Sequence, residues 1–187
     1  MSDPHADSPA RSLSPAAVPL LIGAAIAVAL GTYGNVHDPT GRSIYTLFFT
    51  DTMRLKAWLG TGCVALAVGQ VMIGLRLHGR LGLGNPTPAW LGDLHRLTGT
   101  LTFALSLPVA FHCLWALGYQ TPTARVAAHS LLGCAFYGAF AAKVTAVRGR
   151  DQPTWMVPVL GGATFVILTA IWWTSALWFF RNVTWAL

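Results

Sequence analysis

The sequence predicts an all-α membrane protein, a bundle of five transmembrane helices whose N-terminus is cytoplasmic. The first observation is composition: of 187 residues, 54% are hydrophobic and only 10% are charged, whereas soluble domains carry about 25% charged residues. The second is a series of five apolar runs, each close to the ~20 residues that cross a bilayer core. The third is that basic residues lie between these runs, which is typical of topology control rather than of nucleic-acid binding.

The chain begins with a polar segment, residues 1–15, that we expect to be a disordered tail. This segment is rich in Ser, Pro and Asp and lacks the basic start and the cleavage site of a signal peptide. The rest, residues 16–187, is expected to form one transmembrane domain. Its spans are predicted at residues 16–33, 57–77, 91–117, 123–147 and 155–180.

The connections between the spans differ in character. The longest, residues 34–56, contains an aromatic stretch, SIYTLFFTDTMRLK, that is interrupted by charge. It is too short and too polar to span, so we expect a turn or a short interfacial helix that lies over a site. The glycines of the first two spans favour close packing of a helix or a flat ligand. The three cysteines form no CxxC pattern and are expected to be small buried side chains.

Basic residues predict the orientation of the bundle. The loops between the second and third spans and between the fourth and fifth spans are flanked by Arg76, Arg80, Lys143, Arg148 and Arg150. On the other side, basic residues are mixed with Asp38 and Asp51. The positive-inside rule therefore places the loop between the second and third spans and the loop between the fourth and fifth spans in the cytoplasm, together with the N-terminus.

Histidines inside the apolar runs predict the functional site. His95 and His112 lie in the third span and His129 lies in the fourth, and the pattern His-x-x-x-Gly occurs twice, ending at Gly99 and Gly133. An ionisable residue within a membrane span indicates function. Heme iron is the common reason for a buried imidazole, and the alternative is a histidine that forms hydrogen bonds between helices.

A heme b site with two axial histidines requires two neutral imidazoles that face each other across a flat macrocycle. The third and fourth spans are antiparallel and joined by a short loop, so His112 and His129 are expected to lie level and to form the best ligand pair. Gly133 would make room for the macrocycle. Arg125 is the candidate partner for its propionates.

A second, inner heme is the less direct prediction. It would use His95 and His78, with Gly99 and Arg96 in the corresponding roles. His95 and His112 are 17 positions apart, which at ~100° per residue separates them by roughly 100° around a straight helix. Pro108 lies between them and can change this angle by kinking the helix. Either one or two hemes are therefore compatible with the sequence.

The segments HRLTG, FHC and AHSLLG resemble membrane b-type cytochromes of the ferric-reductase-like and cytochrome b561 kinds. The chain also resembles an uncharacterised family of small multi-span actinobacterial membrane proteins. The resemblance to the b-type cytochromes covers about residues 57–147. It implies a helical bundle that holds one or two hemes, with His95, His112 and His129 as axial ligands. The chain departs from these cytochromes because two histidines occur in one helix only and are more widely spaced.

The expected function is a b-type heme subunit that passes electrons between the quinone pool and a partner redox protein. The setting would be the plasma membrane of a bacterium, with lipid and membrane or extracytoplasmic redox subunits as partners and a quinone as a further ligand. Asp51 and Asp93 could take protons from a quinol or cap helices, and His37 is a further outer histidine. Because the chain has no nucleotide-binding glycine motif and no flavin domain, its status as an enzyme stays open.

Two other classes of function compete with this expectation. One is a non-heme accessory subunit of a respiratory or other membrane complex, in which the histidines hold helices together. The other is a small transporter in which histidines relay protons. No inverted repeat of useful length supports the transporter.

Overall fold

The computed structural model describes residues 14–82 and 86–183, and within these ranges every regular element is a helix. Most of the predicted tail, residues 1–13, lies outside the described residues. The elements are α1 (Ala17–Val36), α2 (Thr52–Leu77), α3 (Trp90–His112), the π-helical turn η1 (Cys113–Leu117), α4 (Ala124–Arg148), α5 (Met156–Trp172), the π-helical turn η2 (Trp173–Leu177) and α6 (Trp178–Asn182).

These elements make five continuous apolar spans, because η1 extends α3 and the segment from α5 to α6 is unbroken. The spans are 20 to 28 residues long, and 20 helical residues already cover about 30 Å, the thickness of a bilayer core. The prediction of an all-α bundle of five spans is therefore confirmed. The chain is a multi-pass membrane protein.

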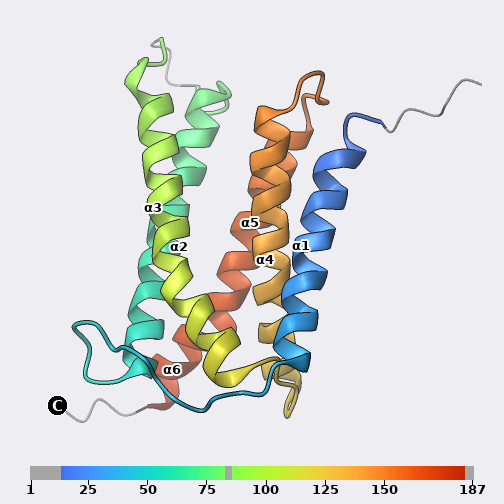
Figure 1. Cartoon of the computed structure of the whole chain (residues 1–187). Coiled ribbons are helices and arrows are strands. Elements are labelled where there is room, and N and C mark those ends of the chain that lie inside the picture. The colour runs from blue at the N-terminus through green and yellow to red at the C-terminus, as the bar shows by residue number, and fades with distance from the viewer. Residues whose placement is uncertain (1–13, 83–85, 184–187) are drawn as a thin grey trace, which may run out of the picture.

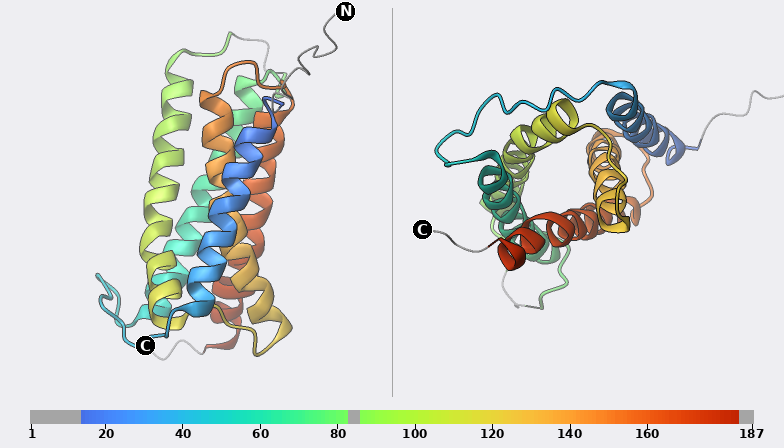
Figure 2. Two further views of the ribbon diagram at one scale, coloured as in Figure 1. Left: turned by 45° about the vertical axis from the view of Figure 1, so that its right-hand side comes forward. Right: turned by 90° about the horizontal axis from the view of Figure 1, so that it is seen from below.

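Four of the spans form a ring and the first packs outside it (Figure 2). α2 packs on α3 and on α5, α4 packs on α5, and α1 packs along α4. We call the end of the bundle that carries the start of α1 the inner end and the other the outer end. At the outer end α1 reaches across to α3, where Leu114 lies 3.3 Å from the Cβ position of Gly34.

α3 and α4 are neighbours in the sequence but diverge toward the inner end (Figure 1). They meet at mid-height, where the rings of Phe103 and Phe140 stack with centroids 4.5 Å apart. Beside this stack the hydroxyl of Tyr137 donates to the hydroxyl of Ser106 at 2.9 Å. The two helices are therefore joined at the middle of the bundle, with space between them above and below.

Glycine sets how closely α1 and α4 pack. A Cβ added at Gly138 would lie 2.5 Å from the carbonyl oxygen of Gly23. A Cβ added at Gly23 would likewise lie 2.5 Å from the carbonyl oxygen of Gly138. Such a distance is below any van der Waals contact, so the two backbones touch because both residues lack a side chain. This matches the expectation that small residues in the first span permit close helix packing.

α2 and α3 are joined by a polar side chain inside the bundle. The amide of Gln70 donates to the backbone carbonyl of His95 at 2.6 Å and also to the hydroxyl of Thr98. Gly99 accommodates this amide, since its Cβ position lies 3.2 Å from the Gln70 oxygen. The space beside Gly99 is thus taken by a neighbouring helix.

The connection before α2 has the form of a turn, one of the two forms expected for it. Residues 38–51 contain this turn but no helix, and α2 begins at Thr52, five residues before the predicted span. The start is fixed by Asp51, whose carboxylate accepts the backbone N–H of Arg54 at 2.8 Å, as an N-cap does. The connection is held to α3 by Tyr45, whose hydroxyl donates to the carbonyl of Pro108 at 2.9 Å. Burial raises the pKa of the Tyr45 phenol, so it stays a donor.

Candidate functional site

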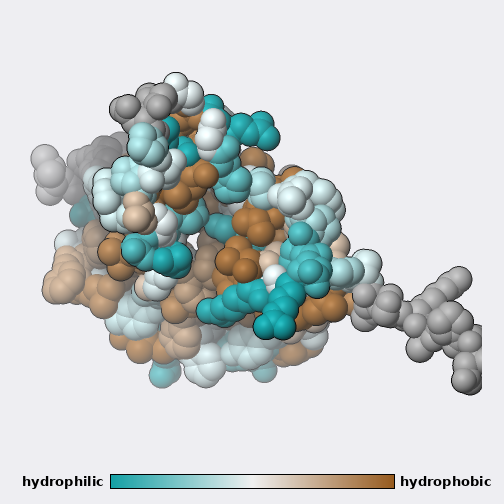
Figure 3. Space-filling view, turned by 90° about the horizontal axis from the view of Figure 1, so that it is seen from above, coloured by the Kyte–Doolittle hydropathy of each residue, from teal (hydrophilic) through white to brown (hydrophobic). Residues whose placement is uncertain are grey.

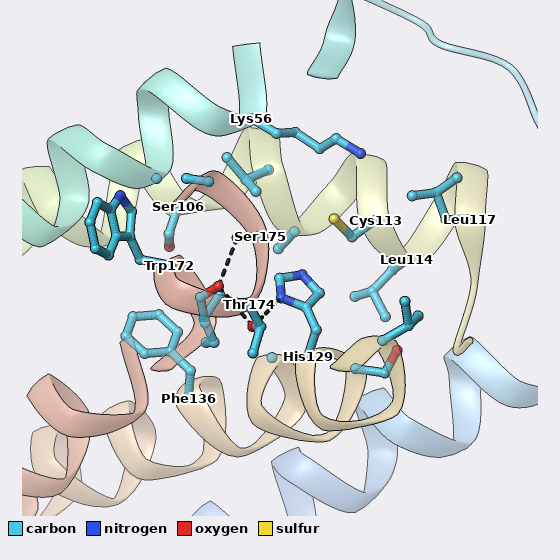
Figure 4. Close-up of a pocket in the computed structure, with 18 of the residues that line it drawn as sticks. Lys56, Ser106, Cys113, Leu114, Leu117, His129, Phe136, Trp172, Thr174 and Ser175 are labelled. Atoms are coloured by element: carbon cyan, nitrogen blue, oxygen red, sulfur yellow. Dashed lines mark hydrogen bonds between the residues drawn. The ribbon is translucent and has the colours of Figure 1, made fainter. Parts of the chain in front are cut away.

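A cavity of about 320 Å³ lies inside the outer half of the ring (Figure 4). This volume is within the range of small-molecule sites, about 300–1,000 Å³. Residues from α2, α3, α4 and α5 line it, together with both π-helical turns and the loop after η1. Most lining residues are apolar, and the Tyr137–Ser106 pair that joins α3 to α4 also lines it.

His129 is the imidazole of this cavity. It lies one turn into α4, and its ring points from α4 into the cavity (Figure 4). The Nδ1 atom is 3.1 Å from the hydroxyl of Thr174. That hydroxyl also lies 2.9 Å from the carbonyl of Ala170 and 3.0 Å from that of Ile171. Because a carbonyl can only accept, the single hydroxyl proton of Thr174 is directed to the backbone.

The hydrogen bonds of Thr174 determine the tautomer of His129. Since the hydroxyl proton is used toward the backbone, the hydroxyl accepts from His129, and Nδ1 carries the proton. Nε2 then keeps its lone pair and has no hydrogen-bond donor among the described residues. A neutral imidazole held through Nδ1–H with a free Nε2 is the state in which histidine binds a metal ion.

The position of Thr174 depends on an irregular helix. Thr174 and Ser175 belong to η2, and Cys113 and Leu114, on the facing side of the cavity, belong to η1. π-helical turns inside α-helices are rare and occur often at functional sites. Here two of them border one cavity, from helices that are far apart in the sequence.

Glycines provide the free space beside His129. Gly133 lies one turn after His129 on the same face of α4, and Gly60 lines the cavity from α2. A Cβ added at either position would meet no atom within 4 Å. These glycines are therefore not required by helix contacts, and larger side chains would enter the cavity.

Two cations lie at the cavity, and none of the described residues that line it is Asp or Glu. Arg125 donates to the carbonyl of Thr174 at 2.6 Å, and its guanidinium lies 4.2 Å from the ring centre of Trp178. A guanidinium has five N–H donors, so further donors remain. Lys56 reaches the cavity from α2 (Figure 4). The site therefore carries positive charge suited to a carboxylate-bearing ligand.

His112, the predicted partner of His129, is buried but is not among the residues that line the cavity. The next residue, Cys113, lines it instead. The reason is helical periodicity: successive residues such as His112 and Cys113 point about 100° apart around the helix axis, so the turn that directs Cys113 to the cavity directs His112 away from it. Pro108 does not bring His112 to the cavity. The two imidazoles do not line one cavity, and their pairing as ligands stays a prediction.

The inner candidates lie near one another but form no cavity with His129. The ring of His95 packs on α2, with Cε1 3.8 Å from the Cβ position of Gly74. His78 ends α2, and its Nδ1 lies 2.8 Å from the carbonyl of Gly74. Arg96 is exposed and is paired with Asp93. No group of three or more His, Cys, Asp or Glu side chains in the described part of the chain has the geometry to hold a metal ion.

The remaining candidates lie outside the cavity. His37 stacks between the rings of Tyr33 and Trp115 at the outer end, with centroids 5.0 and 4.9 Å away. Asp51 caps α2 and Asp93 pairs with Arg96, so neither carboxylate lies at the cavity.

Sequence reasoning found His129, Gly133 and Arg125 but missed Thr174, Lys56 and the π-helical turns. A threonine inside an apolar run gives no signal of its own, since threonines in membrane helices usually bond to the preceding turn. Thr174 does this as well. The clue in the sequence was the pair of adjacent polar residues Thr174–Ser175 at the depth of His129, in a run whose other polar residues, Thr164 and Thr169, stand singly.

Comparison with protein families gives one match, over residues 16–187, to a family described as a family of unknown function, DUF6529. No curated protein matches the chain. No solved structure matches it either. The chemistry must therefore be argued from the site.

Proposed function

The chain belongs to the DUF6529 family of unknown function, and from its cavity we propose that it is a membrane b-type heme protein that transfers electrons. In this proposal His129 is an axial ligand, and the chain works in the plasma membrane of a bacterium between the quinone pool and a partner redox protein. The observation that supports it most is the free Nε2 of His129, directed into an apolar cavity while Thr174 holds Nδ1.

The residues present fit a heme. Gly60 and Gly133 leave open space where a flat macrocycle would need it. Arg125 and Lys56 supply positive charge for propionates at the end of the cavity nearest the outer surface. The apolar lining excludes water. The redox potential of a bound heme would then depend mainly on its histidine ligand and on the hydrogen bonds of that ligand. Heme iron, when bound, supplies one-electron chemistry.

This chain would supply one imidazole to the heme in the outer cavity. The side of the cavity opposite His129 is bounded by Ser106 of α3 and Cys113 of η1 rather than by a second histidine. Since the sequence has no nucleotide-binding motif, electrons would come from a quinol or from a partner redox protein.

The test is a dithionite-reduced minus oxidised spectrum of the protein purified in detergent from a host supplied with heme. We expect a b-type α band in the wild type and its loss in His129→Ala. Gly133→Leu is expected to lose the band as well, because the new side chain would occupy the cavity without striking any neighbouring atom at Cβ.

Matched controls separate these effects from misfolding. Gly162→Leu places the same side chain on an exposed position of α5 that also has open space at Cβ, and His78→Ala removes an exposed imidazole. Both are expected to keep the band. A colourless wild-type protein would refute the proposal and favour a non-heme accessory subunit, and a band that survives His129→Ala would remove this histidine as the ligand.

A further inference from the structure

The inner half of the bundle contains a second pair of nitrogen groups without partners. Nδ1 of His95 is buried and has no hydrogen-bond partner in the described part of the chain. Lys143 of α4 is partly buried and makes no hydrogen bond or ion pair with any described residue. A buried polar group without a partner is costly, so such a pair calls for a ligand.

These two side chains lie at a similar depth in the bundle. His95 is five residues from the start of α3, and Lys143 is five residues from the end of α4. Since the two helices are antiparallel, each lies about 8 Å from the inner end of its own helix. The Lys143 stem runs along α5, with Cε 3.9 Å from the Cβ position of Gly161.

The electrostatics of this end favour an anion. Its acidic groups within the described residues are Asp93, which is paired with Arg96, and Asp151, which is exposed in the loop after α4. The basic residues are more numerous, namely Arg76, Arg80, Arg96, Lys143, Arg148 and Arg150. Neither carboxylate is paired with Lys143, so no acidic side chain of the described residues neutralises it.

The fold gives a lipid access to this pair. α3 and α4 diverge toward the inner end (Figure 1), and at that end hydrophilic and hydrophobic side chains together border a recess between the helices (Figure 3). The Phe103–Phe140 stack closes the space at mid-height with apolar rings. A ligand that fits has an anionic head at the depth of Lys143 and an apolar body that extends between α3 and α4.

We propose that Lys143 and His95 bind the phosphate of an anionic phospholipid whose acyl chains lie between α3 and α4. The predicted inner side of the membrane is where anionic lipids are concentrated and where Lys and Arg attract them. This site is separate from the His129 cavity and does not depend on the presence of heme.

The experiment measures thermal unfolding of the detergent-solubilised full chain during titration with dioleoyl phosphatidylglycerol. We expect Tm to rise by about 5 °C at saturation, with no comparable rise for dioleoyl phosphatidylcholine or for inorganic phosphate. Lys143→Gln and His95→Ala should each reduce the rise, and Lys143→Arg should retain it. Native mass spectrometry should show one retained phosphatidylglycerol in the wild type and none in Lys143→Gln.

The control is Arg96→Gln, which removes an exposed cation of the same end that is already paired with Asp93. It should respond to phosphatidylglycerol like the wild type. Equal stabilisation by phosphatidylcholine, an equal effect of inorganic phosphate, or a full response in Lys143→Gln would overturn the proposal. The α band assigned to His129 is expected in all these variants, so loss of lipid binding and loss of heme are distinguishable.

Discussion

At the scale of single residues, the hydrogen bond between His129 and Thr174 is the feature that selects the chemistry of the cavity. An apolar cavity with a histidine could bind many ligands, but an imidazole whose proton is fixed on Nδ1 presents a lone pair and no donor. Such an imidazole binds a metal ion better than a polar organic group. Thr174 is therefore a positioning residue, and its contribution can be measured.

Thr174→Val removes the acceptor of the Nδ1 proton and keeps the shape of the side chain. We expect the affinity for heme to fall by about 10- to 100-fold, as for other partners of metal-ligating histidines. The midpoint potential should rise, because a ligand without this acceptor is less basic and stabilises the oxidised iron less. Heme titration of the apoprotein and a potentiometric titration are the two measurements.

Thr164→Val is the matched control for this change. Thr164 lies in α5, the helix that η2 continues, and its hydroxyl also donates to the preceding turn, at 2.7 Å to the carbonyl of Leu160. It does not line the cavity. If both variants shift the potential equally, Thr174 does not act through His129.

At the scale of elements, close packing of α1 on α4 depends on two glycines, and this can be tested apart from any ligand. Gly138→Ala places a Cβ 2.5 Å from the carbonyl oxygen of Gly23 and 2.9 Å from Cβ of Ala27. Two backbones must then separate, and overpacking of this kind costs about 1–3 kcal/mol. We expect a lower Tm in detergent for Gly138→Ala, whereas Gly162→Ala should leave Tm unchanged or raise it. Equal Tm values for the two variants would contradict the close contact.

The sequence was sufficient for the spans but not for the distortions within them. Apolar runs and loop charges predict where a helix crosses the membrane, because these depend on local composition. Whether α3 and α4 pack along their length depends on what each meets on its other faces. α4 packs on α1 and α5, and α3 packs on α2, so the two helices that a short loop joins are held apart. η1 and η2 likewise follow from packing around the cavity and have no sequence signature.

Packing also explains why His129 lines the cavity whereas His112 does not. His129 lines the cavity because its face of α4, marked by Gly133 one turn later, is turned toward the ring interior. His112 was predicted to pair with His129 because the two lie at a similar depth in the membrane. Depth does not determine the direction in which a side chain points around its helix. His112 lies about 100° around α3 from His95, and it is the next residue, Cys113, that lines the cavity.

At the scale of the whole molecule, the ring is divided at mid-height by the Phe103–Phe140 stack and the Tyr137–Ser106 hydrogen bond. The outer half holds His129 in an apolar cavity, and the inner half holds Lys143 and His95. Under the lipid proposal His95 binds an anion, and the second heme at this end stays an untested prediction. His129 is the imidazole that lines the outer cavity among the described residues, and under the heme proposal this bears on how many hemes the chain holds and how a bound heme reacts with added ligands.

We therefore expect one heme per chain and a reduced form that binds carbon monoxide. Carbon monoxide needs a free axial position, and the cavity side that faces His129 offers Cys113 and Ser106 but no imidazole. A pyridine hemochrome assay against protein concentration gives the stoichiometry, and the shift of the Soret band on addition of carbon monoxide gives the second result. His112→Ala should change neither, because His112 does not line the cavity. Two hemes per chain, or a reduced form inert to carbon monoxide that becomes reactive in His112→Ala, would instead show that His112 turns inward and pairs with His129.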